Sequence, residues 1–134
     1  MNIIKYFLVV LAIIFFTSCS KNTEKESLIK EKNLESQVYE AYEEGMKSLN
    51  EGDAIFAAKK FNEAEILFPQ SIMAPKSALM AAYSYYSQNY YLDAIAELER
   101  FLRVYPSHKN IDYANYLLAV SFYELIVDEK KDTQ

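Results

Sequence analysis

The sequence predicts an all-α protein, and three observations support this prediction. Only two glycines and three prolines occur among 134 residues, whereas sandwiches, barrels and hairpins need many such residues in their turns. Half of the residues are apolar and a quarter are charged, a composition that permits a packed core. Apolar residues also recur at helical spacing, as in Tyr39, Tyr42, Met46 and Leu49. We therefore expect one domain built from helices.

The composition argues against several classes of function. A formal net charge of −5 disfavours nucleic-acid binding, which needs clustered lysine and arginine. A single cysteine forms no internal disulfide, and a single histidine builds no zinc site. That histidine, His108, lies in a Pro-Ser-His-Lys-Asn turn and is expected to satisfy backbone groups at the start of the last helix. Glu97 and Glu99 are two residues apart and therefore point to different helix faces, which makes them a poor pair for catalysis by two carboxylates. We expect no enzyme, no metal and no cofactor.

The first 18 residues have the layout of a secretory signal peptide. Lys5 precedes an unbroken apolar run over residues 6–16, which is too short to span a bilayer well. Phe16-Thr17-Ser18-Cys19 then resembles the lipobox of bacterial lipoproteins, in which the chain is cut before the cysteine. We expect residues 1–18 to be removed and Cys19 to carry acyl chains such as palmitate. A short transmembrane anchor is the alternative interpretation.

Two further segments follow the predicted cleavage site. Residues 20–33 are polar and charged and lack a regular apolar stripe, so residues 19–33 are predicted to form a lipidated cysteine and a flexible tether. Residues 34–134 are predicted to hold the folded helices. Ser20 follows the cysteine, and in similar lipoproteins the absence of aspartate at this position favours the outer membrane.

The folded part contains an internal repeat. Residues 41–71 align with residues 78–108, and Pro69 and Pro106 are 37 residues apart. A further step of the same length begins a third unit that the chain does not complete. Fixed periods in this range are typical of stacked repeats. With breaks placed at glycine, proline and asparagine, the predicted helices lie near 35–50, 54–68, 73–88, 91–104 and 111–127.

Small and aromatic residues within the units follow a pattern that resembles the tetratricopeptide repeat. The residues that carry it are Gly45, Ala57, Phe61, Ala64 and Pro69 in the first unit and Ala82, Ala94, Leu98, Phe101 and Pro106 in the second. In that repeat, small residues let two helices approach closely and the aromatic residue fills the space between hairpins. Phe101 stands where alanine is usual, so we expect the second hairpin to be looser or differently filled. The resemblance implies a tetratricopeptide-like α-solenoid of helical hairpins, with about two and a half repeats.

Residues 69–124 also resemble the lipoprotein family with such repeats in the outer-membrane β-barrel assembly (Bam) complex. The most specific matches are Asp93-Ala94-Ile95, Pro106-Ser107-His108 and Asp112-Tyr113-Ala114. The resemblance implies a scaffold that is lipid-anchored at the periplasmic face of the Gram-negative outer membrane and aids the folding and insertion of β-barrel proteins. It also implies three kinds of partner: the POTRA domains of the barrel-forming Bam component, other Bam lipoproteins and unfolded outer-membrane proteins. Members of that family carry more repeats, so the chain is either a fragment or a shortened relative.

A groove for peptides or partners is expected along the first helices of the repeats. The 37-residue register places the following residues there: Tyr39, Tyr42, Met46, Lys76, Leu79, Tyr83, Tyr86, Tyr113, Tyr116 and Tyr123. Tyrosine suits a peptide groove because it offers wide apolar contact, a hydroxyl group and few rotatable bonds. The alternative is that many of these rings simply pack between helices.

Two alternative functions remain open. One is a different tetratricopeptide-type periplasmic adaptor, similar to the coordinator linked to the Tol–Pal system, whose relatives lack the signature between His108 and Tyr116. The other is an enzyme on a helical scaffold, for which the sequence shows no active-site constellation.

In either case the apolar face of an incomplete third unit is expected to be partly uncovered and to favour association. The residues on that face are Leu117, Leu118, Val120, Phe122 and Ile126.

Overall fold

Five α-helices make up the part of the chain that the computed structural model describes, namely the backbone of residues 23–131 and the side chains of residues 33–127. They are α2 (Thr23–Asn50), α3 (Ala54–Leu67), α4 (Met73–Ser87), α5 (Tyr91–Val104) and α6 (Ile111–Lys131). No strand occurs among the described residues, which confirms the all-α prediction. The predicted signal peptide and Cys19 lie outside the described residues.

The start of α2 is the main difference from the predicted helices. Helix α2 begins at Thr23, well before the predicted start near residue 35. The added segment contains neither glycine nor proline and is rich in glutamate and lysine, which are good helix formers. Most of the residues predicted to form a flexible tether therefore have helical backbone. The chain divides into two units between Lys32 and Asn33.

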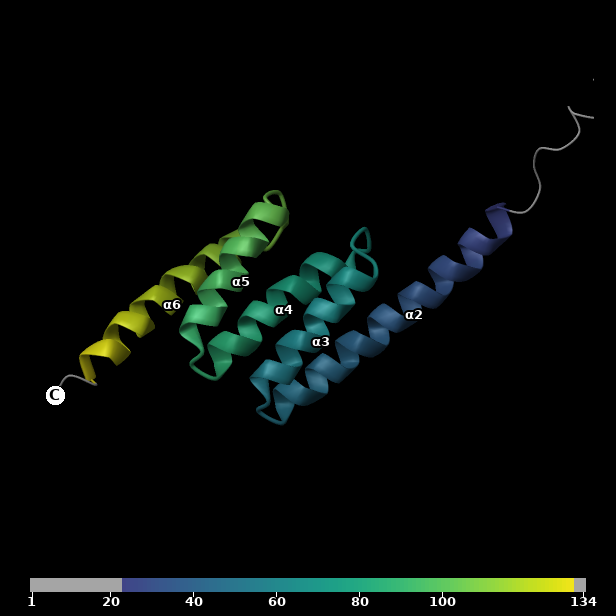
Figure 1. Ribbon diagram of the computed structural model, residues 1–134. Helices are drawn as coiled ribbons and strands as arrows, with labels where there is room; N and C mark the ends of the chain where they lie inside the picture. Colours follow the sequence, from purple (N-terminus) through teal and green to yellow (C-terminus); the bar gives the residue numbers. More distant parts are fainter. Residues whose placement is uncertain (1–22, 132–134) are drawn as a thin grey trace, which may run out of the picture. The chain divides into compact units, whose positions relative to one another are not determined.

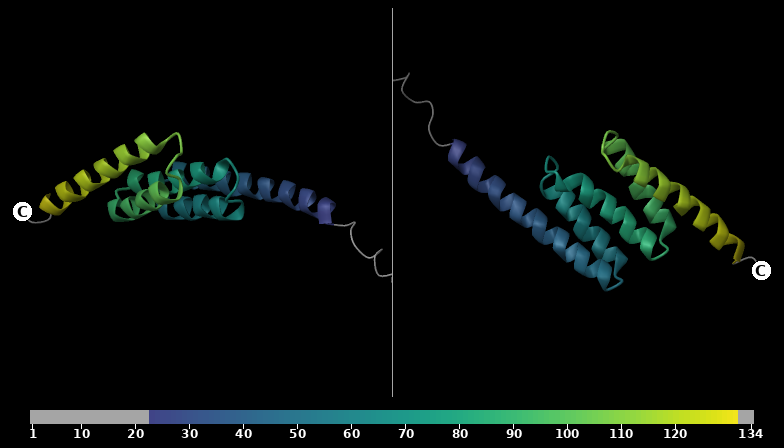
Figure 2. Two further views of the ribbon diagram at one scale, coloured as in Figure 1. Left: turned by 90° about the horizontal axis from the view of Figure 1, so that it is seen from above. Right: turned by 180° about the vertical axis from the view of Figure 1, so that it is seen from behind.

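Within the unit that starts at Asn33, successive helices run antiparallel and follow one another in chain order (Figure 1). Helix α3 packs on α4, α4 on α5 and α5 on α6, and α4 also contacts α6. The view from behind in Figure 2 shows the same succession. The C-terminal part of α2 forms a hairpin with α3, α4 forms a hairpin with α5, and α6 begins a third unit. This arrangement confirms the predicted tetratricopeptide-like solenoid.

The turns inside the two hairpins repeat the same backbone geometry. Gly52 after α2 and Asn89 after α4 are one 37-residue period apart, and their φ angles are 83° and 66°. Both angles lie in the left-handed region, where glycine is most favourable and asparagine is among the better tolerated residues. The sequence thus uses two different residues to end two equivalent helices in the same way.

The connections between hairpins also match. The Ser71 hydroxyl before α4 accepts a hydrogen bond from the Ala74 amide at 3.2 Å. One period later, the Nδ1 atom of His108 accepts a hydrogen bond from the Asn110 amide at 3.3 Å. The expected backbone-capping role of His108 is therefore confirmed. Pro69 and Pro106 precede these residues and lie exposed in the connections.

The first hairpin is held by a close approach of α2 and α3. Phe61 of α3 is fully buried, and its ring centroid lies 5.2 Å from that of Tyr42. A Cβ atom added at Gly45 would lie only 2.8 Å from the Phe61 ring. Ala57 and Ala64 flank Phe61 on α3 and are fully buried as well. Glycine at position 45 is therefore required by the packing of the ring.

The second hairpin has a different filling that is equally well buried. Leu98 takes the position of Phe61, and Phe101 takes that of Ala64; both are fully buried, as are Ala82 and Ala94. The Phe101 ring also contacts two aromatic rings at the next connection, with centroid distances of 5.5 Å to Tyr105 and 5.7 Å to His108. In α5 the aromatic side chain thus stands three residues after the position that Phe61 holds in α3. The second hairpin was expected to be looser or differently filled, and it is differently filled.

A polar cluster joins α3 and α5, the second helices of the two hairpins. We call it the Arg100 cluster, and its members are Asn62, Glu65, Glu97, Arg100 and Tyr105. The Arg100 guanidinium donates to both Glu65 carboxylate oxygens at 2.9 and 2.7 Å and to Glu97 at 2.8 Å. The Tyr105 hydroxyl donates to Glu65 at 2.7 Å. These bonds satisfy a carboxylate whose side chain is only 9% exposed, and they tie one repeat to the next.

Candidate peptide-binding face

Three tyrosines from α4 and α6 lie near one another on the first helices of the second and third units. We call them the tyrosine patch, and its members are Tyr83, Tyr86 and Tyr113. The rings of Tyr83 and Tyr86 are half-buried against the core of the second hairpin, whereas Tyr113 is 44% exposed. Helices α4 and α6 contact each other directly, so the two repeats present these rings together.

The electrostatics of Tyr113 reflect this neighbourhood. Partial burial raises its pKa above the ordinary value, and the negative charge that Tyr83, Tyr86 and Tyr116 carry when ionised raises it further. The Tyr113 hydroxyl therefore stays protonated at neutral pH. It can donate a hydrogen bond to a carbonyl group while its ring makes apolar contact.

Two residues predicted to line the groove lie in the core instead. Tyr42 is 7% exposed and Leu79 is 6% exposed. Tyr42 packs on Phe61, and Leu79 belongs to the buried cluster of the second hairpin. They occupy equivalent positions one period apart, on the side of the first helix that faces its hairpin partner. In the first two units, the residue at this position of the first helix therefore packs in the core and does not line a groove.

The remaining predicted groove residues have varied surroundings. Met46 is half-buried against the first core cluster, and Lys76 is exposed, with its Nζ atom 4.5 Å from the centre of the Tyr42 ring. That distance is within the range of a cation–π contact. Tyr116 is 64% exposed and Tyr123 is 66% exposed, both on α6.

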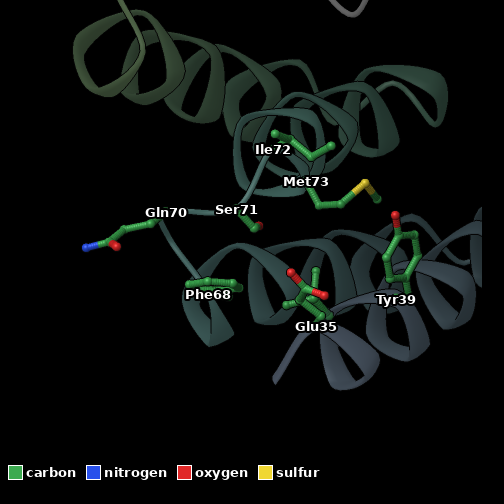
Figure 3. A pocket seen from close by; sticks show the side chains of 8 residues that line it. Glu35, Tyr39, Phe68, Gln70, Ser71, Ile72 and Met73 are labelled. Carbon is green, nitrogen blue, oxygen red and sulfur yellow. The ribbon is translucent and has the colours of Figure 1, made fainter. Parts of the chain in front are cut away.

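Tyr39 lies at a separate pocket of about 350 Å³ between α2 and the connection from α3 to α4. In Figure 3, Tyr39 and Glu35 point from α2 toward Met73 at the start of α4, whereas the Gln70 amide extends away from them. The full set of lining residues is Glu35, Val38, Tyr39, Phe68, Gln70, Ser71, Ile72 and Met73. Most of the wall is apolar, and Ile72 at its edge is 88% exposed.

The sequence analysis missed this pocket and the Arg100 cluster. The pocket combines α2 with a connection more than 30 residues later, and such a meeting is set by the packing of the hairpins. A usable signal existed for the pocket, because two large apolar residues, Ile72 and Met73, come directly after the Pro69-Gln70-Ser71 turn. The Arg100 cluster has no equivalent signal, since its two helices are linked by residues 35 to 40 positions apart.

The residues that the structure describes show neither a metal-binding cluster nor a helix suited to cross a membrane. No group of three or more His, Cys, Asp or Glu side chains there is placed to hold a metal ion. None of the helices in that part of the chain combines the length and apolar character needed to cross a membrane.

Known proteins that are similar to this chain agree with both the helical fold and the expected lipoprotein family. The YfiO family, described as an outer membrane lipoprotein, matches residues 34–134. Outer membrane protein assembly factor BamD of Caulobacter vibrioides is 34% identical over 114 residues, covering 85% of this chain and 36% of that protein. The BamD protein of Rickettsia prowazekii is 35% identical over 91 residues, covering 68% of this chain and 36% of that protein. The BamD protein of Neisseria gonorrhoeae is 40% identical over 80 residues, covering 60% of this chain and 30% of that protein.

The chain therefore spans about a third of the length of these relatives. The family match covers the whole of the packed helical unit apart from its first residue. It includes both complete hairpins, the tyrosine patch and the Arg100 cluster. On this evidence, the chain belongs to the YfiO family of outer membrane lipoproteins.

Proposed function

We propose that this protein takes part in outer-membrane protein assembly as a non-catalytic scaffold that binds unfolded β-barrel segments at the tyrosine patch. Its relatives are named outer membrane protein assembly factors, and the name states their role. The observation that carries the proposal is the gathering of Tyr83, Tyr86 and Tyr113 from two successive repeats on neighbouring first helices.

The chemistry of the tyrosine patch suits such a ligand. Transmembrane β-strands carry apolar side chains at alternate positions and aromatic residues near both ends. An unfolded strand therefore offers apolar side chains for the rings and unpaired backbone carbonyls for the tyrosine hydroxyls. Rings that are already half-buried lose little rotational freedom on binding. Lys76, which is exposed on the same helix as Tyr83, adds a positive charge.

The location of the protein forms part of the same proposal. Cys19 is proposed to carry the lipid after cleavage behind Ser18, and two or more acyl chains give stable anchoring to a bilayer. This anchor would hold the helices at the periplasmic face of the outer membrane. The barrel-forming Bam component, through its POTRA domains, and other Bam lipoproteins are the proposed partners.

A pull-down from envelope membranes tests this proposal. With the full chain as bait, we expect recovery of the barrel-forming component together with unfolded outer-membrane proteins. Recovery of Tol–Pal components without them would support the alternative adaptor and contradict the proposal. The Cys19→Ser variant, which lacks the thiol that would take the lipid, is expected to leave the outer-membrane fraction. Unchanged fractionation of this variant would contradict the proposed anchor.

A further inference from the structure

The pocket beside Tyr39 is a candidate binding site that is separate from the tyrosine patch, and we call it the Tyr39 pocket. Its apolar wall is anchored in the core, because Val38 is 1% exposed, Met73 is 8% exposed and both belong to the first core cluster. Phe68 lines the pocket and packs against the same cluster. A volume of about 350 Å³ is at the small end of the usual range for ligand pockets, roughly 300–1,000 Å³. The pocket therefore suits one or two side chains better than a large ligand.

The place of the Tyr39 pocket in the repeat array decides what can cover it. All of its lining residues come from the first helix of the first hairpin and from the connection to the second hairpin, over residues 35–39 and 68–73. In a solenoid, each repeat contacts only its neighbours. A helix stacked on α6 would therefore lie against the third unit and would leave this pocket open.

The second connection shows which chemical group fits such a place. His108 and Tyr105 lie one period after Ser71 and Phe68. The His108 ring is half-buried and meets the Phe101 ring edge to face, with a centroid distance of 5.7 Å. Ser71 and His108 both accept a hydrogen bond from a backbone amide at the start of the next helix, but only His108 adds a ring. The serine therefore leaves room beside Phe68 where the next repeat carries an aromatic ring.

The charge at the rim of the Tyr39 pocket restricts the residue beside that ring. Glu35 is the one charged residue among those that line the pocket, and it is exposed. Figure 3 shows that Glu35 and Tyr39 point toward Met73 from the same helix. A cation next to the carboxylate could also lie over the Tyr39 ring, which is 53% exposed. The same carboxylate repels the free carboxylate at the end of a peptide chain.

We propose that the Tyr39 pocket binds an aromatic side chain from an internal segment of a partner protein, with lysine or arginine as the adjacent residue. The aromatic ring would pack on Phe68 against the apolar wall formed by Val38 and Met73. The adjacent cation would pair with the Glu35 carboxylate and cover the Tyr39 ring. Aromatic residues and arginine are enriched among the residues that dominate the binding energy of protein interfaces.

A peptide-binding experiment tests the proposed site by filling it. The probe is a short fluorescein-labelled glycine-serine peptide with one central Phe-Arg pair and an amidated end, and its anisotropy is expected to saturate with the full chain in a mild detergent. Ser71→His places the ring of the second connection in the pocket and keeps an acceptor for the Ala74 amide. It is expected to weaken binding at least about tenfold by taking the place of the phenylalanine. Gln70→His adds the same ring to a side chain that extends away from the pocket, and is expected to keep wild-type affinity.

The charge requirement has its own variant. Glu35→Gln is expected to weaken binding of the Phe-Arg peptide about threefold, as for the loss of an exposed ion pair. The same variant is expected to leave the weaker binding of a Phe-Ser peptide unchanged. A peptide that ends in phenylalanine with a free carboxylate is expected to bind more weakly than its amidated form.

Four results would overturn the proposal. They are no saturable binding of the Phe-Arg peptide, equal binding by Ser71→His and Gln70→His, equal affinity of the Phe-Arg and Phe-Ser peptides, and a dimer in sedimentation that Ser71→His abolishes. In the last case a second copy of the chain would occupy the pocket. The Tyr83→Ala/Tyr86→Ala double variant is expected to bind the peptide normally, and loss of binding there would assign the peptide to the tyrosine patch and overturn the proposal as well.

Discussion

At the scale of single residues, the approach of paired helices depends on side chains that are small or absent. Gly45 and Ala82 occupy equivalent positions; Gly45 faces the buried Phe61 ring, and Ala82 belongs to the same buried cluster as Leu98. At Gly45 the contact leaves no space for a methyl group, because the nearest atoms belong to the buried ring of Phe61. A buried ring in a close-packed core has little freedom to move aside.

The first prediction concerns this contact. Gly45→Leu is expected to lower the free energy of unfolding by at least about 1–3 kcal/mol, the usual cost of overpacking a core. Urea denaturation followed by circular dichroism measures the change. Ala96→Leu, on the exposed face of α5, serves as the control and is expected to shift stability by less than about 0.5 kcal/mol. Equal stability of the two variants would show that the first hairpin is not closed at Gly45.

At the scale of elements, the Arg100 cluster links α3 to α5 across two repeats. Arg100 is 32% exposed and the Glu65 side chain 9% exposed, so the pair is partly screened by water. Its bidentate geometry and the additional bonds from Tyr105 and to Glu97 nevertheless satisfy the buried carboxylate. Removing Arg100 leaves the buried Glu65 carboxylate without its opposite charge and with fewer hydrogen bonds. This costs more free energy of unfolding than losing an exposed ion pair.

The second prediction follows from this difference. Arg100→Met is expected to cost roughly 1–3 kcal/mol of unfolding free energy, a value below that of a fully buried pair because Arg100 is partly exposed. Arg103→Met, on the same helix but exposed, is expected to cost less than about 0.5 kcal/mol. Urea denaturation of both variants gives the comparison. If the two substitutions have the same effect, the cluster does not stabilise the stacking of the repeats.

The third prediction concerns the alkaline stability of the same cluster. Burial raises the pKa of Tyr105 above its ordinary value of 10.0, and its hydrogen bond to Glu65 raises it further. The unfolded chain loses this proton first, so the stabilisation is complete below about pH 10 and declines as the pH rises above that value. We expect wild type to lose more unfolding free energy than Tyr105→Phe between about pH 9 and pH 11. Parallel pH profiles would show that Tyr105 does not contribute.

At the scale of the whole molecule, the sequence allowed the repeat and the helices to be predicted, apart from the start of α2 at Thr23. Helix ends coincide with glycine, asparagine and proline, whose backbone preferences are local. The burial of Tyr42 and the exposure of Tyr116 were not predictable in this way, because the two residues share one register and one amino-acid type. Their difference depends on whether a second helix covers them, and that is a property of the assembled repeats.

We propose that two successive repeats present the tyrosine patch to unfolded outer-membrane protein segments. The most direct test of this proposal is the affinity of a fluorescent, unfolded β-barrel segment for the full chain and for the Tyr83→Ala/Tyr86→Ala double variant. Circular dichroism first establishes that the variant is folded. The control is Tyr90→Ala, which removes a tyrosine that lies outside the patch and is as exposed as Tyr113. We expect at least about tenfold weaker binding in the double variant, from the loss of two aromatic contacts, and wild-type affinity in the control. Equal affinity of the folded double variant and wild type would contradict it.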